Sequence, residues 1–182
     1  MAEALRLLHE EHANMTKLLR LLDDQIALFG EGGAPDFGLM LDVMDYMANY
    51  PDHFHHPKED LVFEKLAERA ADARAAVGEL LEEHAELARM TGELEAALNE
   101  VALDAEVPRE HLVRLARAYV ELLRRHMAKE EETVLPRAAE ALTEDDWSEV
   151  DAALTAGDDP LFGSTSHKRY ETLRESLVRY GA

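Results

Sequence analysis

The feature that most constrains the fold is a helical seam that occurs twice. Apolar residues and one histidine recur at alternating spacings of three and four, which is the pattern of a helix packed along one face. The first seam comprises Leu5, Leu8, His12, Met15, Leu19, Leu22, Ile26 and Phe29, and the second comprises Val77, Leu80, His84, Leu87, Thr91, Leu94, Leu98 and Val101. The two superpose without a gap at an offset of 72 residues (84 minus 12). This repeat predicts two helical hairpins built on one plan.

Turn signals set the limits of the predicted helices. The four main helices are expected at about 2–29, 36–70, 73–101 and 108–141, with Pro51 and Pro57 bending the second. A capping box at 143–146 opens a fifth helix that stops at Gly157, a loop follows at 158–164, and a last helix covers about 165–180. Short loops favour an all-α fold, an antiparallel up-down-up-down four-helix bundle with two additional C-terminal helices.

The domain organisation follows from these limits. Residues 1–142 are predicted to form the four-helix bundle, and residues 143–182 a C-terminal helical extension. The extension is expected to pack on the bundle or at a homodimer contact. Its apolar candidates for that packing are Trp147, Leu161 and Phe162.

Charge and composition exclude several classes of function. The formal net charge is −20, which argues against nucleic acid or an anionic membrane as a partner. Because the chain has no cysteine, disulfides, thiolate nucleophiles and iron–sulfur clusters are excluded. No apolar run approaches the roughly 20 residues of a membrane helix. We therefore expect a soluble, cytoplasmic protein.

Four histidines are predicted to lie at one level of the bundle. About 17 residues separate His12 from the end of its helix, and about 18 separate the start of the next helix from His55. The counts on either side of His84 and before His126 match in the same way. With a rise of about 1.5 Å per residue, all four fall within one turn of one another. Four inward histidines in one layer are hard to explain as packing.

A carboxylate accompanies two of these histidines. Glu59 and Glu130 each lie four residues after a histidine, on the same helix face. Buried carboxylates are costly unless they are paired or bind a cation, and the seam offers no lysine or arginine. Lys58 and Lys129 indicate that one edge of these helices is exposed to water. The sequence therefore predicts a metal site on His12, His55, Glu59, His84, His126 and Glu130.

An alternative pair lies one residue further along the second helix. His56 and Asp60 repeat the same spacing, rotated by about 100° around the helix. We favour His55 and Glu59 because Phe63 then continues the apolar face.

Other candidates are less well placed. Glu131 is an alternative to Glu130, since a spacing of five from His126 also reaches a metal, and His9 is an alternative to His12 or a support for it. Tyr119 is expected in the core, with a role beside the metal as the alternative. The remaining histidines are expected at the surface, namely His53, His111 and His167.

The motifs resemble those of the hemerythrin-like, HHE cation-binding family. They are Leu8-His9-Glu10-Glu11-His12, Phe54-His55-His56-Pro57-Lys58-Glu59-Asp60, Glu83-His84 and His126-Met127-Ala128-Lys129-Glu130-Glu131. The resemblance implies a four-helix bundle with two non-heme iron ions, bridged by the two carboxylates and an oxo or hydroxo group. It also implies the same six ligands. Imidazole with carboxylate suits zinc or manganese as well.

One position departs from the oxygen-carrying members of that family. They have two histidines one turn apart on the third helix, whereas Ala88 and Leu80 flank His84 here at that spacing. A thinner ligand shell leaves an open position on a metal, which favours reaction over reversible storage. Ferritin-like proteins are disfavoured because Leu81 and Leu123 stand where their glutamates would be.

The sequence thus favours a metal-binding protein that binds or senses oxygen, nitric oxide, peroxide or iron. A sensor is expected in preference to an enzyme. The alternatives are a di-iron redox enzyme, such as a peroxide reductase, and a metal-independent helical interaction module.

Overall fold

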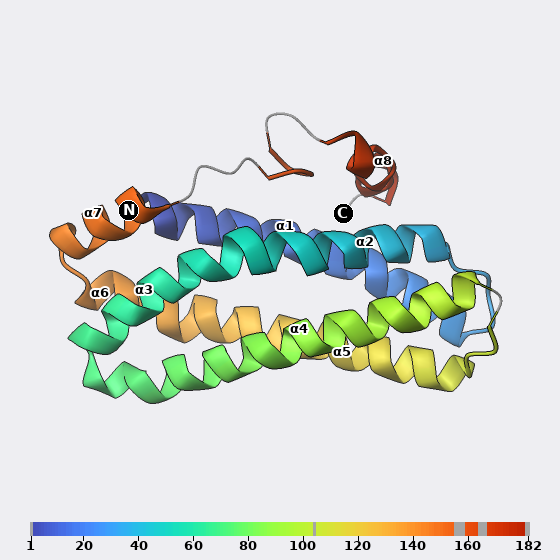
Figure 1. Ribbon diagram of the computed structural model, residues 1–182, viewed down its shortest axis with the longest axis horizontal. Coiled ribbons are helices and arrows are strands. Elements are labelled where there is room, and N and C mark those ends of the chain that lie inside the picture. Colours follow the sequence, from blue (N-terminus) through green and yellow to red (C-terminus); the bar gives the residue numbers. More distant parts are fainter. Residues whose placement is uncertain (1, 104, 155–158, 164–166, 181–182) are drawn as a thin grey trace.

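A computed structural model describes residues 2–103, 105–154, 159–163 and 167–180, and its regular structure there is entirely helical (Figure 1). This confirms the predicted all-α class. The elements are α1 (Glu3–Gly30), α2 (Phe37–Tyr50), the π-helical turn η1 (Pro51–His55), α3 (His56–Arg69), the 3₁₀ turn η2 (Ala71–Ala73), α4 (Arg74–Ala102), α5 (Arg109–Lys129), the π-helical turn η3 (Glu130–Val134), α6 (Leu135–Ala141), α7 (Glu144–Ala153), the 3₁₀ turn η4 (Lys168–Tyr170) and α8 (Glu171–Tyr180).

Four long helical stretches lie lengthwise side by side (Figure 1). They are α1, then α2 with η1 and α3, then α4, then α5 with η3 and α6. α1 contacts α2 and α5, and α4 contacts the same two helices, while α3 and α6 also contact each other. No helix in the described part of the chain is both long enough and apolar enough to cross a membrane.

Two π-helical turns interrupt the second and fourth stretches. In each, a backbone N–H bonds the carbonyl five residues earlier, from His56 to Pro51 and from Leu135 to Glu130. Proline lacks the N–H that an α-helical bond requires, and a proline stands two residues beyond the end of each turn, Pro57 and Pro136. The first interruption falls where the prolines predicted it. The second was not predicted, although Pro136 carried the same signal.

The apolar core is divided into two clusters by a polar layer. The larger cluster extends from Met15 through Tyr46 to Met127, and the smaller one includes Leu8, Phe63 and Val134. The apolar seam residues are buried apart from Phe29 and Val101, which are partly buried. On every long stretch the predicted metal ligands fall between a residue of one cluster and a residue of the other.

The C-terminal helices pack against the first two stretches. α7 contacts α1 and α3, while α8 contacts α1 and α2 (Figure 1). Leu161 is buried, and Phe162 and Trp147 are partly buried against the two core clusters. The division at residue 142 and a homodimer contact both stay predictions.

The limits of these last helices differ from the expected ones. The capping box is present, since the Thr143 hydroxyl accepts from the Asp146 N–H at 3.2 Å and the Asp146 carboxylate accepts from the Thr143 N–H at 2.9 Å. α7 ends at Ala153, and the predicted stop at Gly157 lies outside the described residues. The last helix begins with η4, later than predicted, and residues 165 and 166 also lie outside the described part.

Candidate metal centre

The six predicted ligands meet in the polar layer between the two core clusters. The side chains of the four histidines are between 2% and 11% exposed, and those of Glu59 and Glu130 are fully buried. They come from all four long stretches: His12 from α1, His55 and Glu59 from η1 and α3, His84 from α4, and His126 and Glu130 from α5 and η3. Residues far apart in the chain therefore form one compact cluster.

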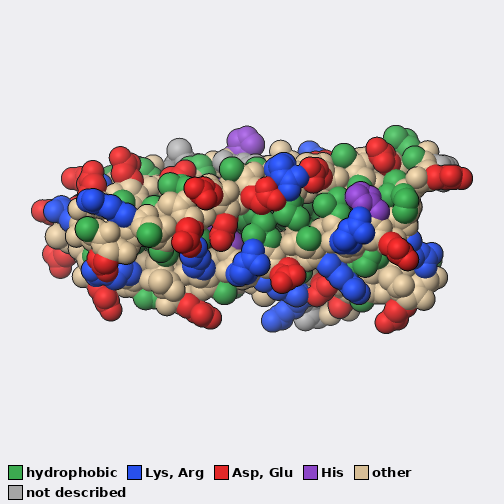
Figure 2. Space-filling model, turned by 90° about the horizontal axis from the view of Figure 1, so that it is seen from below, with side chains coloured by type: hydrophobic (Ala, Val, Ile, Leu, Met, Phe, Trp, Pro, Cys, Tyr) green, Lys and Arg blue, Asp and Glu red, His purple; other side chains and the backbone are tan. Residues whose placement is uncertain are grey.

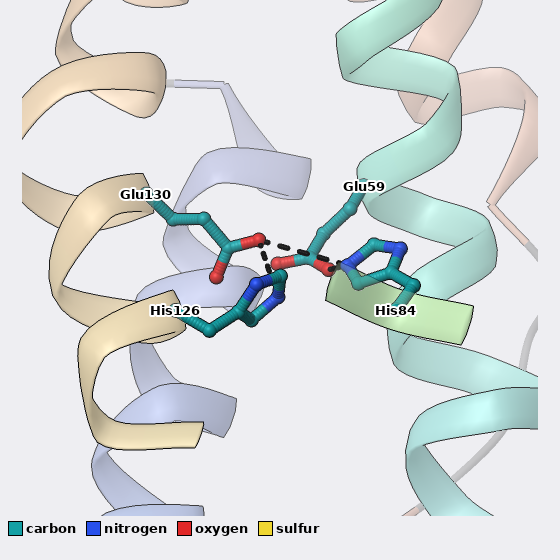
Figure 3. Close-up of side chains that lie close together, drawn as sticks. All are labelled: Glu59, His84, His126 and Glu130. Atoms are coloured by element: carbon teal, nitrogen blue, oxygen red, sulfur yellow. Dashed lines mark ion pairs between the residues drawn. The ribbon is translucent and has the colours of Figure 1, made fainter. Parts of the chain in front are cut away.

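Each glutamate faces histidines from both hairpins. Oε1 of Glu59 lies 3.2 Å from Nε2 of His12 and 3.1 Å from Nε2 of His55, and its Oε2 lies 3.2 Å from Nε2 of His84. Oε1 of Glu130 lies 3.1 Å from Nε2 of His126. Figure 3 shows these two carboxylates facing each other between His84 and His126. Both carboxylates thus lie between the two pairs of imidazoles.

The donor atoms suit metal ions. Glu59, His84, His126 and Glu130 offer donor atoms that all lie within 4.8 Å of one another, and His12, His55 and Glu59 form a second such group. Five buried atoms here lack a hydrogen-bond partner among the described residues: Oε2 of Glu59, Nε2 of His84 and His126, and both carboxylate oxygens of Glu130. Buried polar atoms normally have partners, and a bound cation would satisfy all five. The residues therefore fit the cations that the sequence predicted.

Outer carboxylates orient the imidazoles. Nδ1 of His12 donates to Glu131 at 2.7 Å, and Nδ1 of His55 donates to Glu11 at 2.8 Å. Nδ1 of His126 donates to a third carboxylate, that of Glu83, at 2.9 Å. A carboxylate on Nδ1 fixes the tautomer and leaves the Nε2 lone pair free for a metal. This arrangement is typical of metal-binding histidines.

The cluster strongly favours positive charge. Burial by itself raises the pKa of the Glu59 carboxyl, but the neighbouring imidazoles outweigh it and hold that pKa well below its usual range. Burial lowers the pKa of the His84 imidazole, whereas the carboxylates of Glu130 and Glu59 raise it to about 9. The pKa of His12 is raised for the same reason. Without metal, protons supply the positive charge that the carboxylates require.

The structure separates the alternatives that the sequence left open. Asp60 lies at the edge of the cluster with its side chain 55% exposed and its Oδ1 3.9 Å from Nδ1 of His84, and the ring of His56 stacks on that of His84 at 4.1 Å. Glu131 lies outside the cluster, where it bonds His12 and also His9 at 2.7 Å. The three histidines expected at the surface are exposed, namely His53, His111 and His167.

One expectation was wrong, and two residues were missed. Lys58 does not mark an exposed edge, because it is 6% exposed and its ammonium donates to Glu11. The missed residues are Glu11 and Glu83, which directly precede His12 and His84 in sequence. Each carboxylate bonds a histidine of a neighbouring helix instead. The repeated Glu-His pair could have drawn attention to these glutamates, but the sequence does not show which histidine each one bonds.

A small cavity of about 20 Å³ lies against the cluster. Its lining comprises Met15, Met47, Pro51, His55, His56, Leu87, Ala88, Thr91, Tyr119, Leu123, His126 and Met127. Within this lining His55 and His126 are buried, whereas Ala88 is exposed. Tyr119 is buried in this lining, consistent with its predicted core position.

The amino-acid sequence matches one known protein family over most of its length. Residues 3–138 match the model of the hemerythrin HHE cation binding domain, and the chain belongs to that family. The match confirms the resemblance found in the sequence and makes this a cation-binding protein. The matched region ends within α6, before α7 and α8. No curated protein matches the chain.

Proposed function

We propose that this chain is an antiparallel up-down-up-down four-helix bundle that holds two iron ions. The ring of contacts in which α1 and α4 each pack against α2 and α5 supports that topology. The ligands would be His12, His55, Glu59, His84, His126 and Glu130. Iron follows from the family, since imidazole and carboxylate would also hold zinc or manganese.

The observation that carries this proposal is that the two nitrogens of the imidazole rings face different carboxylates. Nε2 of each histidine faces Glu59 or Glu130, while Nδ1 of His12, His55 and His126 bonds an outer carboxylate. A buried polar network without metal would be expected to satisfy its inward atoms, and here five are without hydrogen bonds among the described residues. The two carboxylates could also be shared between two cations. Each has one oxygen facing His12 or His55 and the other facing His84 or His126.

The cavity supports a small ligand. A water molecule needs roughly 10–15 Å³ of such space, so about 20 Å³ admits oxygen, nitric oxide or peroxide but no larger organic substrate. The bound metals would supply an open coordination position beside it. Ala88, one of the two positions one turn from His84 at which oxygen carriers could have their further histidine, lies in the lining. We therefore propose sensing of, or reaction with, a small oxidant or nitric oxide instead of oxygen transport.

Macromolecular partners are not part of the proposal. Figure 2 shows acidic and basic side chains interspersed over one face of the molecule, and the net charge is −20. A polyanion such as nucleic acid would be repelled by such a chain.

A second candidate is a di-iron enzyme that reduces peroxide, which the same open position favours. Steady-state consumption of peroxide in the presence of an added electron donor, which supplies the two electrons that each peroxide takes up, would support it over a sensor if it is lost in His84→Ala. A sensor would instead react once and give no turnover.

Metal analysis of the purified protein tests the main proposal. We expect two iron equivalents per chain, near-ultraviolet absorption of a di-iron centre, and a spectral change on adding azide or nitric oxide. Glu130→Gln should lose metal, whereas Glu64→Gln, an exposed glutamate on α3, should retain both equivalents. A chain that folds without metal and whose stability does not change when iron is added would overturn the proposal.

A further inference from the structure

The internal repeat pairs the residues of the centre. His12 corresponds to His84, 72 positions later, and His55 corresponds to His126, 71 positions later (126 minus 55). We call His12 and His55, with Oε1 of Glu59 and Oε2 of Glu130, the first subsite. The second subsite is His84 and His126 with the other oxygen of each glutamate. The outer carboxylates Glu11 and Glu83 are also repeat partners, each bonded to the later histidine of a subsite.

The two subsites offer the same donors. Nε2 of His12 lies 3.2 Å from Glu59 and 3.3 Å from Glu130, and Nε2 of His84 lies 3.2 Å and 3.8 Å from the same two carboxylates. Each subsite therefore has two imidazoles and one oxygen from each glutamate. The carboxylate of Glu130 lies within 4.8 Å of all other donors only in the second subsite, so the donors themselves do not favour the first. Weaker binding at the second subsite must therefore result from groups outside this set.

The outer carboxylates differ at one repeated position. Glu131 is the partner of Asp60, 71 positions earlier, and an aspartate side chain is one methylene shorter. The Glu131 carboxylate accepts from Nδ1 of His12 at 2.7 Å. Asp60 faces Nδ1 of His84 from 3.9 Å, which is beyond hydrogen-bonding distance. The missing methylene coincides with the missing hydrogen bond.

A second difference acts in the same direction. His9 bonds Glu131 through Nδ1 at 2.7 Å and so helps to hold that carboxylate against His12. The repeat partner of His9 is Leu81, an exposed apolar residue that has no polar atom to offer Asp60. The side chain of Asp60 is 55% exposed, against 34% for Glu131.

The hydrogen bond on Nδ1 affects how well Nε2 binds a cation. A carboxylate acceptor keeps the proton on Nδ1, orients the ring and raises the basicity of Nε2, and removing such partners typically costs 10–100-fold in metal affinity. His84 keeps its ring plane by stacking on His56 at 4.1 Å, but a stacked ring does not accept the Nδ1 proton. At 11%, the side chain of His84 is also the most exposed among the four histidines.

We propose that the two subsites hold their cations unequally: the first retains its ion, and the second, at His84 and His126, binds more weakly and exchanges its ion. Asp60, which stands where the repeat has Glu131, sets the difference. This inference rests on the proposed function, because it requires that the cluster bind two cations. It makes the chain a protein that keeps one cation and exchanges the other with its surroundings.

Titration of the metal-free protein with cobalt(II) tests the inference, since the visible spectrum of cobalt reports each binding step. We expect two steps whose affinities differ by about 10–100-fold, and two-phase release when a chelator is added. Asp60→Glu should tighten the weak step and slow the fast phase of release. Glu131→Asp should weaken the tight step, so that the two steps converge.

Matched controls separate these effects from general changes in charge or side-chain length. Asp24→Glu on α1 and Glu64→Asp on α3 make the same changes at exposed positions and should leave both steps unaltered. Two equal steps in the parent protein, or unequal steps that neither Asp60→Glu nor Glu131→Asp changes, would overturn the inference while leaving two-cation binding intact. Binding of no cobalt at all would instead overturn the proposed function and this inference with it.

Discussion

Lys58 and Glu11 form an ion pair in the interior of the protein, with their side chains 8% and 7% exposed. The same carboxylate accepts a hydrogen bond from the hydroxyl of Tyr50 at 2.8 Å and another from Nδ1 of His55 at 2.8 Å. A buried lysine thus neutralises the carboxylate that orients one of the proposed ligands.

Lys58→Met should destabilise the protein, because the Glu11 carboxylate would remain buried without its cation. Breaking a buried pair from one side typically costs about 3–5 kcal/mol. Urea unfolding of the metal-free protein measures the loss. Lys168→Met, at an exposed position, should stay within about 0.5 kcal/mol of the parent. Equal unfolding midpoints for the two variants would show that the pair contributes nothing.

Glu59→Gln should remove metal binding more completely than the loss of a single histidine. The carboxylate of Glu59 faces three imidazoles, and a glutamine offers only one oxygen and no charge. Metal content should fall from two equivalents to one or fewer, while circular dichroism shows the helices retained. Glu64→Gln serves again as the exposed control on the same helix. An unchanged metal content would exclude Glu59 as a shared ligand.

The metal-free protein should lose stability as the pH rises from neutral to alkaline. Burial lowers the pKa of His84, but Glu130 and Glu59 together raise it to about 9 in the folded state, against about 6.5 when unfolded. The stabilisation is therefore complete below about pH 6.5 and is lost as the pH passes through about 9. Its size is on the order of 1–3 kcal/mol.

Thermal unfolding between pH 6 and pH 9.5 measures this dependence, with His84→Gln as the variant in which it should be reduced. Since a metal binds the neutral imidazole, adding metal at pH 7.5 should also release protons, which calorimetry in two buffers can count. Metal binding without proton release would contradict the raised pKa.

Ala88→Phe should slow the access of small ligands without changing the metal content. Ala88 is an exposed residue of the cavity lining, so we infer that the cavity opens beside it and that a phenyl ring there would fill the opening. Reaction with azide or peroxide, followed by stopped-flow absorbance, should slow by roughly tenfold or more, because entry would then require side-chain motion. Ala85→Phe, an exposed position that does not line the cavity, is the control. Equal rates in the two variants would place the entrance elsewhere.

Much of the fold and of the cluster could be predicted because both follow from spacing along helices. The seam that contains Leu8, His12 and Met15 fixes which face of α1 is buried. Equal helix lengths on either side of the turns then bring His12 and His84 to one level. These relations need only the regular rise and rotation of a helix.

The remaining features depend on how neighbouring helices meet. Glu11 precedes His12 in sequence but bonds His55, and this pairing follows from the distance between helices, which the sequence does not give. Lys58 was wrongly placed at an exposed edge because a lysine side chain is long enough to reach inward from the margin of a buried face. Asp60 and Glu131 could be recognised as repeat partners, yet the distances that distinguish them required the structure.

The π-helical turns have a consequence for comparing this chain with others of its family. Each holds one residue more than an α-helical turn, so the helix beyond it is rotated by about 100° relative to an uninterrupted one. The turn η3 begins at Glu130 itself. In a relative whose π-helical turn comes before the position of Glu130, the extra residue would shift the carboxylate that faces the metals by one position. That carboxylate would then lie five residues after the histidine instead of four. Alignments should accordingly place single-residue gaps at η1 and η3, where a ligand displaced by one position in sequence occupies the same place in space.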